Sequence, residues 1–141
     1  MMKSKMNLLM LMGIVVASME FHGSTTQTTH IVGYGLGWEM PKKDELDSIW
    51  ASHEEFHVND VLFFNFTTGF HTVAEVTKEA YNNCDSRNPI SLATIGPANI
   101  TINTAGDHFY ICTIGVHCIL FQKLAISVRG KNTNLSAIPP N

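Results

Sequence analysis

Beyond about residue 28, hydrophobic positions occur in short runs of β-branched and aromatic residues, separated by glycine, proline, asparagine and aspartate. Within these runs apolar and polar residues tend to alternate, so that Ile100 and Ile102 fall on one face and Asn99 and Thr101 on the other. Such runs predict β-strands. The predicted strands are Thr29–Gly33, Val58–Thr67, Thr72–Val76, Asn99–Asn103, His108–Thr113 and Lys123–Val128.

Helical patterns are scarce. Only Lys78–Asn83 has the pattern of a brief helical turn, and the chain has no internal repeats. Several short strands at regular spacing, without a long amphipathic helix, predict an all-β fold, an antiparallel sandwich or barrel. Trp38 and Trp50 are expected to pack in its core or at its edge.

The N-terminus has the layout of a secretory signal peptide. Lys3 and Lys5 precede the apolar stretch Met6–Ala17, which is roughly twelve residues long and well short of the roughly 20 that span a bilayer. We place the signal peptide at residues 1–23, a single domain at 24–130 and a polar tail at 131–141, which lacks the apolar segment of a lipid anchor. The mature protein is therefore expected to be secreted and to have no membrane anchor.

Charge excludes one class of partner. The chain has 9 lysine and arginine residues against 12 acidic residues, a net charge of −3, and its basic residues are scattered. Nucleic acid is therefore not an expected partner. Three sequons predict glycosylation at Asn65, Asn99 and Asn134, and the alternation described above places Asn99 on the solvent face.

The cysteine count is odd. Cys84, Cys112 and Cys118 are the 3 cysteines, so one thiol is left over if two pair in an oxidising compartment. The spare thiol is either a buried, inert cysteine or a thiolate that holds a metal ion.

One segment carries candidate metal ligands. Cys112, His117 and Gln122 recur at intervals of five residues between two predicted strands, and His71 lies in the turn before another. Two imidazoles, one thiolate and a weak fourth donor are the ligand set of an electron-transfer copper centre. An amide oxygen as the axial donor is harder than a thioether, so it should favour Cu(II) and lower the reduction potential.

A second metal motif competes with the first. His53, Glu54 and His57 match the His-Glu-x-x-His pattern of zinc hydrolases, which requires a helix. The motif runs directly into a predicted strand, and no third ligand follows at a suitable spacing. We therefore interpret these histidines as exposed loop residues.

Several ordered segments resemble the phytocyanins, a family of plant blue copper proteins with the cupredoxin fold. The resemblance extends over about residues 29–129, and several matching motifs in order are more specific than any one of them. The segments are Trp50–Ala51, Phe56–Phe64, Phe70–Cys84, Gly106–Cys112, His117–Cys118 and Gln122–Val128.

The resemblance implies a cupredoxin Greek-key β-sandwich of about seven to eight strands with one or two short helical turns. It also implies a disulfide between Cys84 and Cys118, which leaves Cys112 as the copper thiolate. This pairing would account for the odd number of cysteines.

The resemblance further implies one type 1 copper ion held by His71, Cys112 and His117. Gln122, as the axial ligand, resembles the stellacyanin branch rather than the methionine-ligated branches. The protein is then expected to be a monomeric, extracellular electron carrier of the apoplast or cell wall, and not an enzyme. Its redox partner would be a small molecule or a protein.

An alternative function remains open: a non-redox extracellular module that binds wall polymers or proteins, either metal-free or filled with zinc. Two positions also depart from the family pattern. Gly115-Val116 replaces the usual Pro-Gly before the second histidine, and Phe121 replaces a usual glycine before the axial residue. Loss of proline removes stiffness and phenylalanine lacks the backbone freedom of glycine, so the loop is expected to differ in shape.

Overall fold

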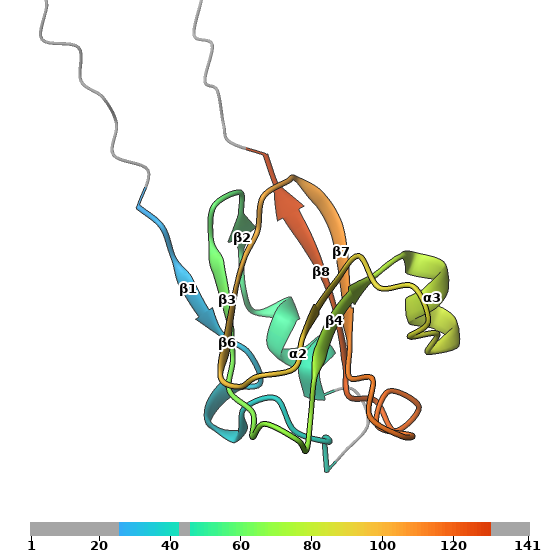
Figure 1. Ribbon diagram of the computed structural model, residues 1–141. Coiled ribbons are helices and arrows are strands. Elements are labelled where there is room, and N and C mark those ends of the chain that lie inside the picture. The colour runs from blue at the N-terminus through green and yellow to red at the C-terminus, as the bar shows by residue number, and fades with distance from the viewer. Residues whose placement is uncertain (1–25, 43–45, 131–141) are drawn as a thin grey trace, which may run out of the picture.

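The computed structural model describes residues 26–42 and 46–130 (Figure 1). The predicted signal peptide, residues 1–23, and the predicted tail, residues 131–141, which includes the Asn134 sequon, lie outside this part of the chain. Within the described part, none of the helices is long and apolar enough to cross a membrane.

Two β-sheets form the fold, in agreement with the predicted all-β sandwich (Figure 1). The smaller sheet has the strand order β1 (Thr29–Ile31), β3 (Val61–Phe64) and β6 (Ala98–Thr101). The larger sheet has the order β2 (Phe56–His57), β8 (Lys123–Arg129), β7 (Gly106–Ile111), β4 (Val73–Val76) and β5 (Ser91–Ala93).

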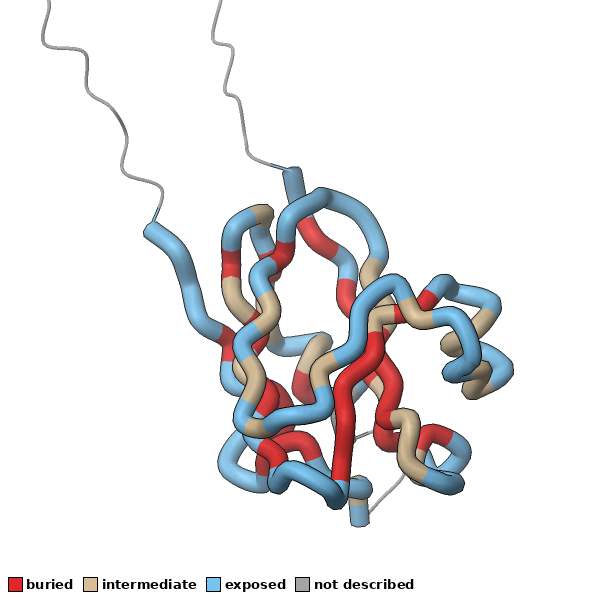
Figure 2. Tube along the Cα trace, viewed as in Figure 1, coloured by how far each residue is buried: buried red, intermediate tan, exposed pale blue. Residues whose placement is uncertain are grey.

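The core lies where the apolar faces of the strands meet. Leu124, Ile126 and Val128 of β8 are buried while the residues between them are exposed, as the alternation predicted. Figure 2 shows buried stretches along the strands and exposed loops around them. Trp38 and Trp50 are both buried in this core, which confirms their predicted packing role. Burial of large apolar side chains contributes about 1.5–3 kcal/mol each.

One predicted strand was wrong at its start. The segment Val58–Thr67 forms a strand only at β3, because Asn59 turns the chain with a φ of 79°. The Asp60 carboxylate accepts a hydrogen bond from the His57 backbone N–H at 2.9 Å and stabilises this turn. The residues before the turn form β2, which belongs to the other sheet.

The sandwich is not purely antiparallel. Strand β1 pairs in parallel with β3, and β2 pairs in parallel with β8, whereas the remaining pairs are antiparallel. Parallel neighbours need a long crossover connection, and the one between β1 and β3 contains the short helices η1 (Tyr34–Leu36) and α2 (Leu46–Ser52). The sequence pattern did not reveal either helix, nor strand β5.

The predicted helical turn is confirmed at its predicted bounds as α3 (Lys78–Asn83). The Thr77 hydroxyl caps its start by accepting a hydrogen bond from the Ala80 N–H. Cys84 ends the helix in the left-handed conformation, with a φ of 51°. The helix thus delivers Cys84 towards the loop between β7 and β8.

Candidate metal centre

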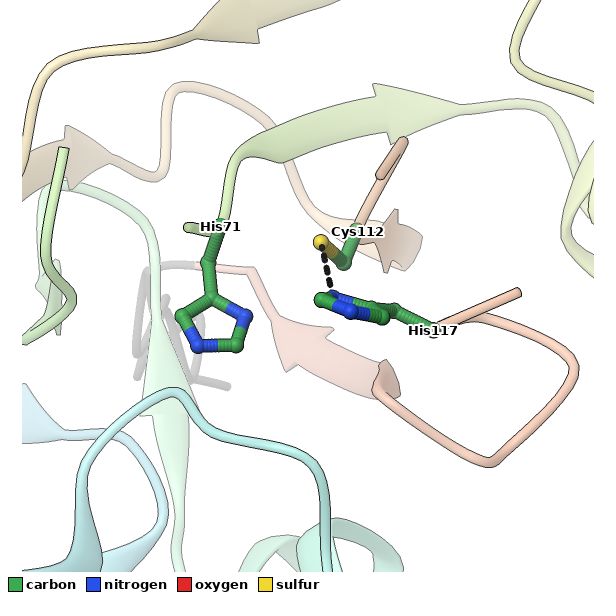
Figure 3. Close-up of side chains that lie close together, drawn as sticks. All are labelled: His71, Cys112 and His117. Carbon is green, nitrogen blue, oxygen red and sulfur yellow. Dashed lines mark hydrogen bonds between the residues drawn. The ribbon is translucent and has the colours of Figure 1, made fainter. Parts of the chain in front are cut away.

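Two loops, the one before β4 and the one between β7 and β8, bring the candidate ligands together (Figure 3). His71 immediately precedes Thr72 and β4, Cys112 directly follows β7, and His117 lies in the loop between β7 and β8. His71 and Cys112 are buried, and His117 is half-buried. The Cys112 Sγ atom and one nitrogen from each ring all lie within 4.8 Å of one another.

The donor atoms face one another. The Cys112 Sγ atom lies 3.5 Å from His117 Nδ1, and the His71 Nδ1 atom lies 3.1 Å from the Gln122 side-chain oxygen. The two imidazole rings are tilted, with centroids 5.1 Å apart. Figure 3 shows both rings and the sulfur around one space. A soft thiolate with two imidazoles fits copper by its donor chemistry.

The orientation of Gln122 is fixed by its neighbours. Its side chain is fully buried, and Nε2 donates a hydrogen bond to the Trp38 carbonyl at 3.1 Å. The amide oxygen is thereby directed towards His71. The backbone N–H of Gln122 donates to the His117 carbonyl at 2.9 Å, and its own carbonyl accepts from the Cys112 N–H at 3.1 Å. Gln122 therefore lies beside the other three residues, as its predicted axial role requires.

The loop between β7 and β8, residues 112–122, is called the ligand loop below. One of its residues, Phe121, has a backbone conformation that usually requires glycine. Phe121 has a φ of 69°, in the left-handed region that costs a non-glycine residue free energy. Gly115 also has a positive φ, of 49°. Phenylalanine has therefore been forced into a backbone conformation that suits glycine, and its side chain lies on the surface, 41% exposed.

A pair of threonines that the sequence pattern did not reveal joins the two loops. The Thr72 and Thr113 hydroxyl oxygens lie 2.7 Å apart, and Thr72 Oγ1 accepts a hydrogen bond from the Thr113 N–H at 2.9 Å. Thr72 Oγ1 also lies 3.9 Å from the Cys112 sulfur. Their positions in the sequence could have revealed them, because each threonine directly follows a predicted ligand.

The cysteines pair as the family resemblance implied. Cys84 and Cys118 form a disulfide, and Cys112 is free and buried. The disulfide joins the end of α3 to the residue next to His117. The odd cysteine is thus the one whose sulfur faces the two histidines.

The competing zinc motif is not assembled. Helix α2 ends at Ser52, so His53 lies in the following turn and His57 lies in β2. Glu54 instead contacts His30, at 2.8 Å between Oε2 and Nδ1. Across residues 26–42 and 46–130, the only group of three or more potential ligands is the one that contains Cys112. Both histidines are exposed, as interpreted, but the loop placement was wrong for His57, which lies in β2.

The two sequon asparagines in the described part of the chain, Asn65 and Asn99, are both exposed. Asn99 lies in β6 on the solvent face, as the alternation predicted. Their glycosylation stays a prediction.

A β-sandwich with two histidines and a free cysteine converging at one end defines a cupredoxin with a site of the type 1 copper kind. Residues 38–121 match the plastocyanin-like domain. The chain belongs to this family and, within it, to the phytocyanins. The family resemblance of the sequence motifs is thus confirmed.

Individual relatives support this membership. A blue copper protein of Arabidopsis thaliana is 40% identical over 108 residues, which cover 77% of this chain and 55% of that protein. Stellacyanin of Toxicodendron vernicifluum is 38% identical over 103 residues, 72% of this chain and 96% of that protein. The structure of cucumber stellacyanin with Cu2+ superposes with a TM-score of 0.69 and 37% identity, covering 76% of this chain and 100% of that one.

Proposed function

We propose that the protein is an electron carrier that binds one copper ion through His71, Cys112 and His117, with Gln122 as the axial ligand. The observation that carries this proposal is the convergence of a free, buried thiol and two imidazole nitrogens within 4.8 Å. Copper bound there would pass between Cu(II) and Cu(I) by exchanging one electron.

The surrounding residues suit fast electron exchange because they hold the donors still. The hydrogen bonds between Thr72 and Thr113, and between Gln122 and Trp38, fix three of the ligand-bearing segments before any metal arrives. Burial of Cys112 keeps water from its sulfur, and the half-buried His117 offers an edge through which electrons can reach a partner. A harder axial oxygen from Gln122 favours Cu(II) and a lower reduction potential.

We further propose that the protein works outside the cell, as a monomer with a small-molecule or protein redox partner. The Cys84–Cys118 disulfide supports this location, since disulfides persist in oxidising compartments. The exposed Asn65 and Asn99 sequons and the predicted signal peptide agree with secretion.

Visible spectroscopy of the purified, copper-loaded protein tests the copper centre. We expect an intense thiolate-to-copper absorption that is lost in the Cys112→Ser variant. The double variant Cys84→Ser/Cys118→Ser is the matched control, because it removes two sulfurs but keeps the proposed ligand. A wild-type protein without this absorption, or a Cys112→Ser variant that retains it, would overturn the proposal.

Cyclic voltammetry of the same sample tests the electron-transfer role. We expect one reversible one-electron wave that disappears with the visible band in Cys112→Ser. Metal analysis that finds zinc or no metal after expression with copper available would instead support the alternative, a non-redox binding module.

A further inference from the structure

The outer edge of the His71 ring contacts an acidic residue that no predicted role includes. The His71 Nε2 atom lies 2.8 Å from a carboxylate oxygen of Glu39. On the opposite side of the ring, Nδ1 faces Gln122 and the other donors. The two nitrogens of one buried ring thus serve two different partners.

We propose that Glu39 tunes the copper centre by accepting a hydrogen bond from His71 Nε2–H. This bond presents Nδ1 as the coordinating nitrogen, and the negative charge lowers the reduction potential. The inference rests on the proposed function, since it concerns the metal that His71 would hold.

The position of Glu39 is fixed by the residue before it. Trp38 is fully buried, its backbone N–H donates to the Asn65 carbonyl at 2.8 Å, and its ring N–H donates to the Thr72 carbonyl at 2.8 Å. Its own carbonyl accepts the hydrogen bond from Gln122. The backbone entering Glu39 is therefore tied to the residue that follows His71 and to the axial ligand.

Gly37 allows the segment that carries Trp38 and Glu39 to pack closely against Asn65. Its φ is 76°, and a Cβ atom at this position would lie 2.7 Å from the Asn65 carbonyl oxygen. A side chain there would push the segment away from the loop that carries His71. The close packing therefore keeps the backbone next to Glu39 within reach of the loop that carries His71.

Burial differs sharply between the two partners. The His71 side chain is 8% exposed, whereas the Glu39 side chain is 51% exposed. The carboxylate therefore keeps much of its hydration while one oxygen reaches the ring, so holding its charge there costs little. A histidine that binds a metal through one nitrogen commonly donates its other N–H to such a partner, which fixes the ring and raises its basicity.

The sign of the effect follows from charge. Two neutral imidazoles, one thiolate and a neutral amide leave the site one unit more positive with Cu(II) than with Cu(I). A nearby negative charge stabilises the more positive state more strongly, so Glu39 favours Cu(II). Removing the charge should therefore raise the reduction potential.

The experiment compares Glu39→Gln, which can keep a hydrogen-bond acceptor without the charge, with Glu39→Ala, which removes both. We expect both variants to stay blue and to shift the Cu(I)/Cu(II) ratio at a fixed potential about tenfold towards Cu(I), or about 59 mV for a one-electron couple. Glu55→Gln is the matched control, because Glu55 pairs with Arg129 at the far end of β8. Its potential should equal that of the wild type.

Nuclear magnetic resonance of the diamagnetic Cu(I) protein provides a second measurement. We expect a His71 Nε2–H signal that is protected from solvent exchange in the wild type and exchanges faster in Glu39→Ala. This measurement reports the hydrogen bond itself, independently of the potential.

The outcomes separate this inference from the proposed function. A blue wild-type protein whose potential is unchanged in Glu39→Gln overturns the tuning role and leaves a purely structural contact. An unprotected Nε2–H signal in the wild type overturns the hydrogen bond. A wild-type protein that takes up no copper overturns the proposed function, and this inference with it.

Discussion

At the residue scale, Gln122 has the two ends of its amide in different surroundings. The nitrogen donates to the Trp38 carbonyl, so the oxygen is left facing the His71 ring. The residue is fully buried, so neither the amide nitrogen nor the amide oxygen can exchange its partner for water. A change at this position alters the electronic properties of the site and the packing beneath it together.

We expect the Gln122→Met variant to stay blue and to have a higher reduction potential, because a thioether favours Cu(I) more than an amide oxygen does. Its free energy of unfolding should fall by about 1–3 kcal/mol, since the buried Trp38 carbonyl loses its donor. Spectroelectrochemistry and denaturant titration measure the two effects. Gln27→Met is the control, because its amide donates to the exposed Asn59 carbonyl instead, at 2.9 Å. An unchanged potential in Gln122→Met would contradict an axial role.

Phe121 stores backbone strain next to Gln122, with a φ of 69°. We expect the metal-free Phe121→Gly variant to be more stable than Phe121→Ala by about 1 kcal/mol, because only glycine adopts this conformation without cost. Comparison with alanine separates backbone strain from loss of the half-exposed ring. Urea unfolding of the two variants measures the difference, and equal stabilities would show that the loop relaxes in another way.

At the scale of elements, a cluster of histidine and carboxylate side chains around the buried His30 ties three of them together. His30 of β1 lies 2.8 Å from Glu54, which follows α2, and 3.0 Å from Asp60, which precedes β3. His57 Nδ1 lies 3.8 Å from the same Asp60 carboxylate. The contacts of His30 therefore add stability to the short edge strand β1, because the backbone pairing of its three residues alone contributes little.

This cluster should make stability depend on acid pH. Burial raises the pKa of Asp60, but the hydrogen bonds from His30 and from the backbone N–H groups of His57 and Thr28 outweigh it and hold the pKa below its usual value of 3.8. A lowered carboxyl pKa stabilises the fold fully above the unfolded-state value, and that contribution is lost as the pH falls through the folded-state value.

We therefore expect the free energy of unfolding of the wild type to decrease below about pH 4 more steeply than that of Asp60→Asn. The variant should also be less stable at neutral pH. Urea titrations across the acid range test this, with Asp107→Asn on the exposed face of β7 as the control. Parallel pH profiles for the wild type and Asp60→Asn would contradict the assignment.

At the scale of the whole molecule, the Cys84–Cys118 disulfide closes a loop between residues 34 apart in sequence. It anchors the ligand loop to α3 on the outside of the sandwich. The hydrogen bonds of Thr72 and of Trp38 hold the same site from the inside. The metal site is therefore supported from two directions.

Removing the disulfide in Cys84→Ala/Cys118→Ala should lower the free energy of unfolding by about 4 kcal/mol, from the loop-closure entropy of a loop of this length. The visible copper band should survive at temperatures where the variant stays folded, because Cys112 is untouched. Denaturant titration and absorption on one sample check both expectations. A loss below about 1 kcal/mol would mean that the unfolded chain gains little freedom.

Much of the fold could be predicted from the sequence, because alternation along β6 and β8 and the helical pattern of Lys78–Asn83 are local. The start of β3 could not, because the apolar run Val58–Thr67 continues past the turn at Asn59, and the residues before that turn pair with the distant strand β8. Strand β5 was missed because it is short and mostly exposed, and therefore lacks a clear apolar period. Helix α2, with only 7 residues, is likewise too short to show a clear helical period.

The sequence by itself indicated the candidate ligands, the odd thiol and the family, because these follow from residue types and from the spacing of the motifs. It also determined which face of each long strand is buried. Only the tertiary structure decided what surrounds those ligands: Glu39 on the outer edge of His71, the threonine pair, and the carbonyl that orients Gln122. These contacts join residues far apart in the chain, and only packing of the two sheets brings them to hydrogen-bonding distance.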